Sequence, residues 1–388
     1  MFNKRSLTGI PPIAKAHGFP SRDYAMTRKF SEYVSPGHPD KCADYISEYI
    51  LDRYLEKDPN VRYAVEVMVK GNMVHLAGEI TSTVYFGYWE YKGFVKCALR
   101  EIGYTEEYAD AWGGKVINPE NIELQVDITA QSPEIGQGVD NDGWGDQGIF
   151  FGYADPDEEY MTPCSHSLAK DLCHMLYIQA RNDGIGGIDI KTEIILDEDG
   201  LIEKIIAAVP CRSDAEHEAV MNSIEGWLDN WYENIPSDRK PDELYSPSII
   251  LNGTGNYVMH GPIADCGITG RKLVVDFYGG ELHVGGGSPW TKDGSKADLT
   301  LNLFARAMAI KYARERNQPV KVSVACCIGR SEIDYVVETT CGEEITDGKM
   351  NVTPKELIKQ YDLNKPIFAS MCKFGLFGKY QQDKKWER

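Results

Sequence analysis

The strongest constraint on the fold is a strand–turn–strand pattern near the start of the chain. Apolar residues occupy every second position from Val61 to Val69. A period of two is typical of a β-strand with one buried face and one exposed face. Gly71-Asn72 provides a tight turn, and a second strand is expected over residues 73–81. The segment therefore predicts an antiparallel hairpin.

Two more hairpins are predicted further along the chain, each accompanied by helices. Consecutive hairpins argue against a sheet built from alternating βαβ crossovers. We therefore predict an α+β fold of three similar domains, whose hairpin-containing sheets carry helices on one face. The later hairpins are expected over 188–197 with 201–209 and over 319–328 with 333–340. An amphipathic helix is expected over 40–57, helices near 87–102 and 297–316, and further strands at 121–130, 248–252 and 271–278.

The chain divides into a basic start and three expected domains. Residues 1–30 hold six Lys or Arg and a single acidic residue. This arm is either a poorly ordered tail or a contact to a neighbouring subunit or an anionic ligand. It lacks the apolar core of about 7–15 residues that a secretory signal needs. We expect an N-terminal domain over 31–133, a lid and central domain over 134–258, and a C-terminal domain over 259–388.

The charge balance and the cysteines narrow the class of protein. Acidic residues outnumber basic ones by 59 to 41, which gives a net charge of −18. Such a chain repels nucleic acid and anionic lipid, so neither is an expected partner. No apolar run approaches the roughly 18 residues that span a bilayer. The ten cysteines form no Cys-x-x-Cys pair, and Cys326-Cys327 lies in an expected buried strand, which predicts reduced thiols in a cytoplasmic protein.

A glycine-lysine segment over residues 285–298 is the most informative candidate site. Gly285-Gly286-Gly287 leaves backbone N–H groups open to a ligand. Lys292 and Lys296 are four residues apart, which would place both ammonium groups on one side of a helical turn. Asp293 and Asp298 add carboxylates for a cation. This combination suits a polyphosphate with its divalent metal, and a flexible Gly/Ser surface loop is the equally weighted alternative.

Three further features carry polar groups suited to the same kind of ligand. Residues 37–41, Gly-His-Pro-Asp-Lys, precede the first helix, where an anion is favoured and where His38 and Lys41 can donate to phosphate. A helix cap is the alternative. Residues 265–272 form a glycine-spaced turn that ends in two cations before an expected strand, or else a solvated loop. Glu66 is a lone carboxylate in the first hairpin, or else part of an exposed face.

One tempting motif is rejected on its context. Gly143 to Gly148 fits Gly-x-Gly-x-x-Gly, but an acidic turn-rich loop precedes it and a short β-like run at 149–151 follows. A dinucleotide site needs a strand before the motif and a helix after it. The chain also has no Gly-x-Ser-x-Gly and no His-Glu-x-x-His motif.

Taken together, the motifs resemble one family, the methionine adenosyltransferases or S-adenosylmethionine synthetases. Their order and approximate spacing hold from residue 31 to about 376. The matching segments are Gly-His-Pro-Asp-Lys at 37–41, Gly-Glu-Ile-Thr at 78–81, Gln-Ser-Pro-Glu-Ile at 131–135, Gln-Gly-Val-Asp at 137–140, Gly-Asp-Gln-Gly at 145–148, Gly-Pro at 261–262, 265–272 and the glycine-lysine segment.

The resemblance implies a reaction, its cofactors and an assembly. The family joins the sulfur of L-methionine to C5′ of ATP and cleaves the released triphosphate to pyrophosphate and phosphate. A thioether needs no general base, so the demand is for positioning and for cations near the leaving group. Two Mg²⁺ and one K⁺ per site are implied. So is a homodimer or homotetramer with the active site between subunits, and residues 131–147 resemble the family's lid.

The resemblance also implies roles for individual residues. His38, nearest the breaking bond, would act on the triphosphate with Lys191, Arg271, Lys272 and Lys292. Asp40 and Asp298 would ligate Mg²⁺, and Glu66 would hold K⁺. The substrate methionine would be bound by Glu79, Gln131, Asp265 and Lys296, with Asp146. Asp189 and Tyr257 would contact the nucleoside, with Asp265 and Ser288 also in the nucleotide site.

Several positions depart from the family pattern. Asn256-Tyr257 replaces the usual Arg-Phe, Ser288 replaces an alanine, and Leu299 replaces an arginine. The lid is shorter between Asp140 and Gly145. Two alternative functions follow, namely a triphosphate hydrolase that lost methionine selectivity and a non-catalytic regulatory paralogue. The retained residues for binding methionine argue against the hydrolase. The retained residues for binding phosphate and metal argue against the regulatory paralogue.

Overall fold

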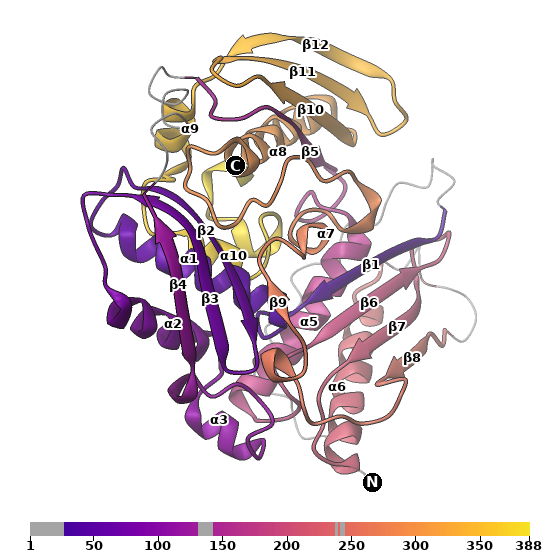
Figure 1. Cartoon of the computed structure of the whole chain (residues 1–388). Coiled ribbons are helices and arrows are strands. Elements are labelled where there is room, and N and C mark those ends of the chain that lie inside the picture. Colours follow the sequence, from indigo (N-terminus) through magenta and orange to yellow (C-terminus); the bar gives the residue numbers. More distant parts are fainter. Residues whose placement is uncertain (1–26, 131–142, 237–239, 241–244) are drawn as a thin grey trace.

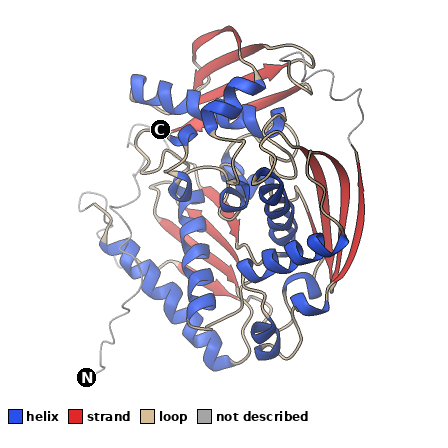
Figure 2. Cartoon of the chain, turned by 90° about the vertical axis from the view of Figure 1, so that its left-hand side faces the viewer, coloured by secondary structure: helices blue, strands red, loops and turns tan. Residues whose placement is uncertain are grey.

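The computed structural model describes residues 27–130, 143–236, 240 and 245–388 (Figure 1). Its strands form three four-stranded sheets, and helices pack on each of them. The predicted α+β class is therefore confirmed. Figure 2 shows the sheets surrounding long helices rather than stacking on one another.

The first sheet contains the hairpin predicted from alternation. β2 (Arg62–Lys70) and β3 (Met73–Thr81) pair antiparallel around Gly71, whose φ is 63°. β4 (Glu123–Thr129) joins β3 in parallel after α2 (Tyr88–Ile102) and α3 (Glu106–Ala111). β9 (Gly267–Ile268) pairs with the far end of β2. Helix α1 (Pro39–Leu55) packs on β2.

The second sheet repeats this arrangement. β6 (Lys191–Leu196) and β7 (Ile202–Ala208) form the hairpin, and β8 (Ser248–Leu251) joins β7 in parallel after α6 (Asp214–Glu233). β1 (Lys29–Val34) pairs antiparallel with β6. Helix α5 (Cys164–Asn182) packs on β1 and β6. The matching order accounts for the similar helix and strand pattern in the sequence.

The third sheet is entirely antiparallel. β10 (Val320–Cys326), β11 (Glu332–Thr339) and β12 (Glu344–Asn351) follow one another, and β5 (Gly148–Ala154) pairs with β10. Helix α8 (Ala297–Arg316) covers β5 and β10, and α9 (Pro354–Tyr361) and α10 (Phe368–Cys372) lie near the end of the chain.

Each sheet takes one edge strand from a distant part of the chain. The first sheet takes β9 from the C-terminal third, the second takes β1, and the third takes β5. The three units are thus interleaved in sequence. The contiguous ranges 31–133, 134–258 and 259–388 stay a prediction about domain organisation. The exchange matters for function because β9 carries residues 265–272 to the start of α1.

Helix α1 is buried on every side, contrary to the amphipathic helix predicted for 40–57. Every residue of α1 except Arg53 is buried. Its apolar side packs on β2, and its polar side is covered by α10 and by β9. Several buried carboxylates therefore lie along this helix. The spacing of apolar residues along a helix does not reveal that its polar side is covered as well. Here the covering elements come from the distant C-terminal third of the chain.

Two other local predictions are wrong. The strand expected at 271–278 is instead the short helix α7 (Leu273–Asp276). Asp276 is fully buried between apolar neighbours, so its side-chain contacts override the β propensity of the flanking residues. Cys326 ends β10 only half-buried, and Cys327 is exposed, so this pair is not in a buried strand.

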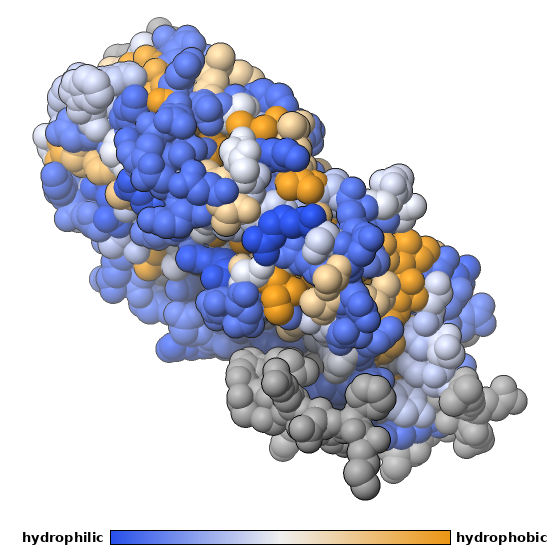
Figure 3. Space-filling view, turned by 90° about the horizontal axis from the view of Figure 1, so that it is seen from below, coloured by the Kyte–Doolittle hydropathy of each residue, from blue (hydrophilic) through white to orange (hydrophobic). Residues whose placement is uncertain are grey.

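Figure 3 shows one face that is mostly hydrophilic, with small separate apolar areas. Among the described residues, the helices are too short or too polar to cross a bilayer.

The final residues are fixed by a buried ion pair that offers a test of the fold. Arg306 of α8 is fully buried, binds Glu387 at 2.7 Å and donates to the carbonyl groups of Tyr153 and Met161. Arg306→Met should lower the free energy of unfolding by about 3–5 kcal/mol, because Glu387 would be left buried and unpaired. The shift of the urea midpoint, followed by tryptophan fluorescence, measures this.

The matched control is Lys311→Met on the same helix. Lys311 lies 4.0 Å from Glu315 with both side chains exposed, so its loss should cost about 0.5 kcal/mol or less. Equal midpoints for the two variants would contradict a stabilising role for the Arg306 pair.

Candidate active site

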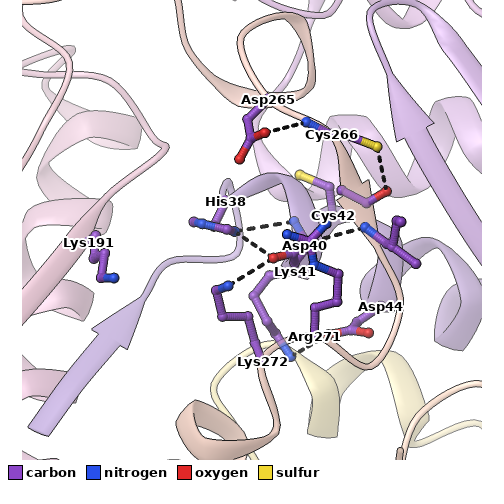
Figure 4. A network of polar contacts seen from close by, with 12 residues as sticks. His38, Asp40, Lys41, Cys42, Asp44, Lys191, Asp265, Cys266, Arg271 and Lys272 are labelled. Atoms are coloured by element: carbon purple, nitrogen blue, oxygen red, sulfur yellow. Dashed lines mark hydrogen bonds and ion pairs between the residues drawn. The ribbon is translucent and has the colours of Figure 1, made fainter.

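The start of α1 gathers a set of charged groups that we call the helix-start cluster: His38, Asp40, Arg271 and Lys272 (Figure 4). His38 is the N-cap, and its Nδ1 accepts the N–H of Asp40 at 3.2 Å. Asp40 Oδ2 lies 2.8 Å from Lys272 Nζ, and Asp40 Oδ1 accepts the N–H of Ile268 at 3.0 Å. Arg271 is exposed, with its Nε 3.4 Å from Asp40 Oδ1.

The protonation states of this cluster follow from burial and from Lys272. Burial, with the charge of Lys272, lowers the pKa of His38 to about 4. Burial opposes ionisation of Asp40, but the hydrogen bonds from Lys272 and Ile268 outweigh it and lower the pKa of Asp40. At neutral pH the cluster therefore combines a neutral imidazole, a carboxylate and two cations.

Lys191 lies across from His38 on β6 (Figure 4). Its ammonium group forms an ion pair with Glu32 of the neighbouring strand β1 and is exposed. Its charge contributes to the lowered pKa of His38. The structure thus brings four of the five predicted triphosphate residues to one place, from three separate parts of the chain.

The predicted nucleoside residues lie beside this cluster. Asp189 Oδ2 accepts the N–H of Gly261 at 2.8 Å, and burial raises the pKa of Asp189 to about 7. Tyr257 is half-buried, and burial followed by the charge of Asp189 raises the pKa of Tyr257. Asp265 is exposed and accepts the N–H of Cys266 at 2.8 Å. Figure 4 places Asp265 next to His38.

The glycine-lysine segment forms a second group, the glycine-loop cluster: Gly287, Lys292 and Asp298. The N–H of Gly287 donates to Asp298 Oδ1 at 2.8 Å, and Lys292 forms an ion pair with the other carboxylate oxygen. A Cβ on Gly285 would lie 2.4 Å from the carbonyl oxygen of Ile149. The glycines therefore permit close packing against β5, as well as an open backbone.

The segment is neither a loose loop nor a helical turn. Trp290 and Thr291 are fully buried, and Lys292 forms a β-bridge with Ala64 of β2. Helix α8 begins only at Ala297. The prediction that Lys292 and its neighbour four residues later share a helical turn is therefore wrong, because pairing with β2 keeps the segment extended at Lys292.

The predicted methionine residues are divided between the two clusters. Glu79 is exposed on β3, opposite Ala64, which also bridges Lys292. Lys296 is the N-cap of α8, while Asp146 is exposed next to β5. Asp265, by contrast, lies in the other cluster, and Gln131 lies outside the described residues, as does most of the predicted lid.

The two clusters occupy different ends of β2. Residues Ala64 and Met68 face the glycine loop and β9 respectively, about 13 Å apart along the strand. Glu66 lies between them and accepts the hydroxyl groups of Thr269 and Thr291. In the described part of the chain, no ion pair joins a cation of one cluster to a carboxylate of the other.

One predicted phosphate donor has a different role. Lys41 is buried, with its ammonium group 2.7 Å from Asp276 and 3.2 Å from Asp44. These carboxylates raise the pKa of Lys41 well above its usual value, against the effect of burial. Lys41 therefore stabilises the interior. Sequence analysis did not identify Asp276 as its partner, because Asp276 lies in the segment predicted as a strand.

Comparison with known proteins agrees with the motifs. Residues 27–133 match the model of the S-adenosylmethionine synthetase N-terminal domain, and 259–388 match that of its C-terminal domain. The S-adenosylmethionine synthase of Nocardia farcinica is 31% identical over 92% of this chain and 94% of its own. That of Nitratiruptor is 32% identical over 94% and 96%.

A solved structure gives the same answer. The structure of an unusual S-adenosylmethionine synthetase from Campylobacter jejuni aligns with a TM-score of 0.80 at 30% identity, over 94% of this chain and 97% of that one. The chain belongs to the S-adenosylmethionine synthetase family. The predicted resemblance is thus confirmed for the family, while the residue roles stay predictions.

The departures from the family pattern have structural consequences. Ser288 approaches Gly270 so closely that a Cβ there would lie 2.9 Å from the Ser288 side chain. Leu299, in place of the family's arginine, is fully buried. Asn256 donates to Asp214 at 3.0 Å. Ser288 thus lies against the segment that carries Arg271, Leu299 belongs to the interior, and Asn256 is exposed on the surface.

The lowered pKa of His38 predicts a pH dependence of stability. The unfolded chain binds a proton at His38 below about pH 6.5, whereas the folded chain does so only below about pH 4. Between these values His38 makes the protein less stable as pH falls. His38→Asn keeps an N-cap acceptor, so this variant should gain stability relative to wild type as pH falls from 7 to 5.

Urea midpoints of the two proteins at pH 7, 6 and 5 measure the effect. Titrating groups that His38 does not influence cancel in the difference between the proteins. A difference that does not change with pH would mean that His38 titrates normally.

Proposed function

We propose that this chain synthesises S-adenosylmethionine from ATP and L-methionine. The observation that carries the proposal is the helix-start cluster, where Arg271 and Lys272 from one segment meet His38 and Asp40 from another. Within this family, the natural ligand of such a cluster is the triphosphate of ATP. Asp189 and Tyr257 beside it provide the place for the nucleoside.

The chemistry needs cations more than it needs a base. The sulfur of methionine attacks C5′ of ATP, the C5′–O bond breaks, and the triphosphate leaves with the bonding electrons. Negative charge grows on the leaving oxygen, next to neutral His38, which can donate a hydrogen bond. Fixed cations stabilise this charge in the transition state. Cleavage of the triphosphate to pyrophosphate and phosphate would use the same cations.

The predicted metal ligands suit cations that bind together with the substrate. Across the described ranges, no group of three or more His, Cys, Asp or Glu side chains is arranged to hold a metal ion. Mg²⁺ commonly binds one or two carboxylates together with substrate phosphates, so Asp40 and Asp298 suit two such ions. When bound, Mg²⁺ would neutralise phosphate oxygens. Glu66 with two threonine hydroxyls offers the oxygen ligands that suit K⁺.

The division of the site favours an assembly of two subunits. Glu79 and Lys292 lie at one end of β2, whereas Asp265 and His38 lie at the other. A second copy of the chain that places its glycine-loop cluster opposite the helix-start cluster would bring the methionine and triphosphate residues together. We therefore propose a homodimer or homotetramer with the active site between subunits.

One assay separates the proposal from its alternatives. The pure protein is incubated with ATP, L-methionine, Mg²⁺ and K⁺, and the sulfonium product is sought by mass spectrometry. Breakdown of ATP that does not depend on methionine would favour a hydrolase. Absence of both reactions would favour a regulatory paralogue.

Lys292 provides a test of the phosphate role. Lys292→Ala should lower kcat at least about 100-fold, because a cation on the leaving triphosphate is lost, and change the KM for methionine less than about threefold. Lys365→Ala, an exposed lysine paired with Asp362, is the control and should leave both constants unchanged. An unchanged kcat in Lys292→Ala would remove this lysine from the mechanism.

Mixed assemblies test the shared site. Lys272→Ala disables the helix-start cluster and Lys292→Ala the glycine-loop cluster. In a dimer that contains one chain of each kind, both changes fall in one site and the other site is intact. Co-expression of the two inactive chains should therefore restore about a quarter of wild-type activity, since about half of the dimers are mixed. No restored activity would place both clusters in one subunit.

A further inference from the structure

The segment that carries Lys292 is attached to the polar side of α1 at two points. Trp290 Nε1 donates to Asp276 Oδ2 at 2.7 Å, and Asp276 Oδ1 lies 2.7 Å from Lys41 Nζ. The ammonium group of Lys41 also lies 4.9 Å from the centre of the Trp290 ring. All three side chains are buried. This first attachment fixes the residue two positions before Lys292.

The second attachment holds a strained residue. Thr291 has a φ of 75°, in the left-handed region that a β-branched residue rarely adopts. Its N–H donates to Glu48 Oε1, its carbonyl accepts the N–H of Val65 at 3.0 Å, and its hydroxyl donates to Glu66 at 3.0 Å. Every polar group of Thr291 is thus bound, which is what an unfavourable conformation requires in order to persist.

Glu48 has no part in the chemistry proposed above. It is fully buried in α1, two helical turns after Lys41, and its Oε2 has no hydrogen-bond partner among the described residues. Burial raises the pKa of Glu48 well above its usual value, and the nearby Asp52 and Asp44 add to this. Among the described residues, the one hydrogen bond to its side chain comes from the N–H of Thr291.

Lys292 lies between two fixed neighbours. On the other side of it, the N–H of Asp293 donates to the carbonyl of Tyr63 at 3.1 Å, and Asp293 Oδ2 accepts the N–H of Tyr63 at 2.9 Å. The direction of the Lys292 side chain thus depends on the peptide of Thr291 keeping its orientation. If the peptide bond between Trp290 and Thr291 were reversed, the backbone strain at Thr291 would be relieved. The side chain of Lys292 would then point in another direction.

We propose that Glu48 is a positioning residue that holds the Thr291 peptide in its left-handed conformation and so directs Lys292 toward the triphosphate. The proposal rests on the proposed function and adds a residue to it. It also means that α1 organises both clusters, the helix-start cluster from its first turn and the glycine-loop cluster from its third.

The test compares Glu48→Ala and Glu48→Gln with a matched control. Asp52→Ala removes another buried carboxylate one turn later, which accepts the N–H groups of Phe368 and Ala369 and, within the described ranges, has no hydrogen bond to the Lys292 segment. Glu48→Ala should lower kcat about 10- to 100-fold with little change in the KM for methionine. Glu48→Gln keeps the acceptor oxygen and should retain most of the activity. Asp52→Ala should lose stability while keeping kcat.

Two combinations separate positioning from general destabilisation. If Glu48 acts through Lys292, adding Glu48→Ala to Lys292→Ala should reduce kcat by less than about twofold more. Adding Thr291→Gly to Glu48→Ala should recover part of the activity, because glycine adopts a positive φ without strain. Full additivity, or equal kcat losses in Glu48→Ala and Asp52→Ala, would overturn the proposal.

Hydrogen exchange gives a readout that does not need catalysis. By mass spectrometry, the peptide covering 288–294 should exchange faster in Glu48→Ala than in wild type or Asp52→Ala. Unchanged exchange would overturn the positioning role. If the wild-type protein made no S-adenosylmethionine, the proposed function would fail, while the exchange result would still decide whether Glu48 holds this segment.

Discussion

The buried ion pair between Lys41 and Asp276 is the contact on which the arrangement of the site depends. Both groups are fully enclosed, so either charge without the other would be strongly destabilising. The pair ties Asp276, the last residue of the short helix α7, to α1, and Asp276 also accepts a hydrogen bond from Trp290. The two segments that carry Arg271-Lys272 and Lys292 are thereby both held on the polar side of one helix.

The exchange of edge strands explains how such distant residues meet. β9 is only two residues long, yet its pairing with β2 places the N–H of Ile268 on Asp40 and the N–H of Gly270 on Asp44. β5 gives the glycine loop a surface close enough to exclude any Cβ at Gly285. The sheets therefore do more than form three cores, because two of the exchanged strands, β9 and β5, also hold segments of the candidate site in place.

Local pattern predicted part of this and could not predict the rest. The first hairpin follows from alternation, since a period of two is visible within ten residues. The strand expected at 271–278 fails because the burial of Asp276 is decided by Lys41, more than 200 positions away in the sequence. The amphipathic reading of α1 fails for the same reason, since its polar side is covered by β9 and α10. Motif resemblance identified the family, but it assigned Lys41 no partner and gave Glu48 no role.

The charges of the site explain how so acidic a chain can accept a triphosphate. Lys272 is paired with Asp40, and Lys292 with Asp298, so each of these two predicted phosphate cations is neutralised by a predicted metal ligand. A triphosphate alone would take the lysines and leave two carboxylates facing its own negative charge. A metal ion alone would take the carboxylates and leave the lysines facing a cation. Binding of both together exchanges each internal ion pair for two favourable contacts, and for this reason the proposed substrate is the metal complex of ATP rather than ATP itself.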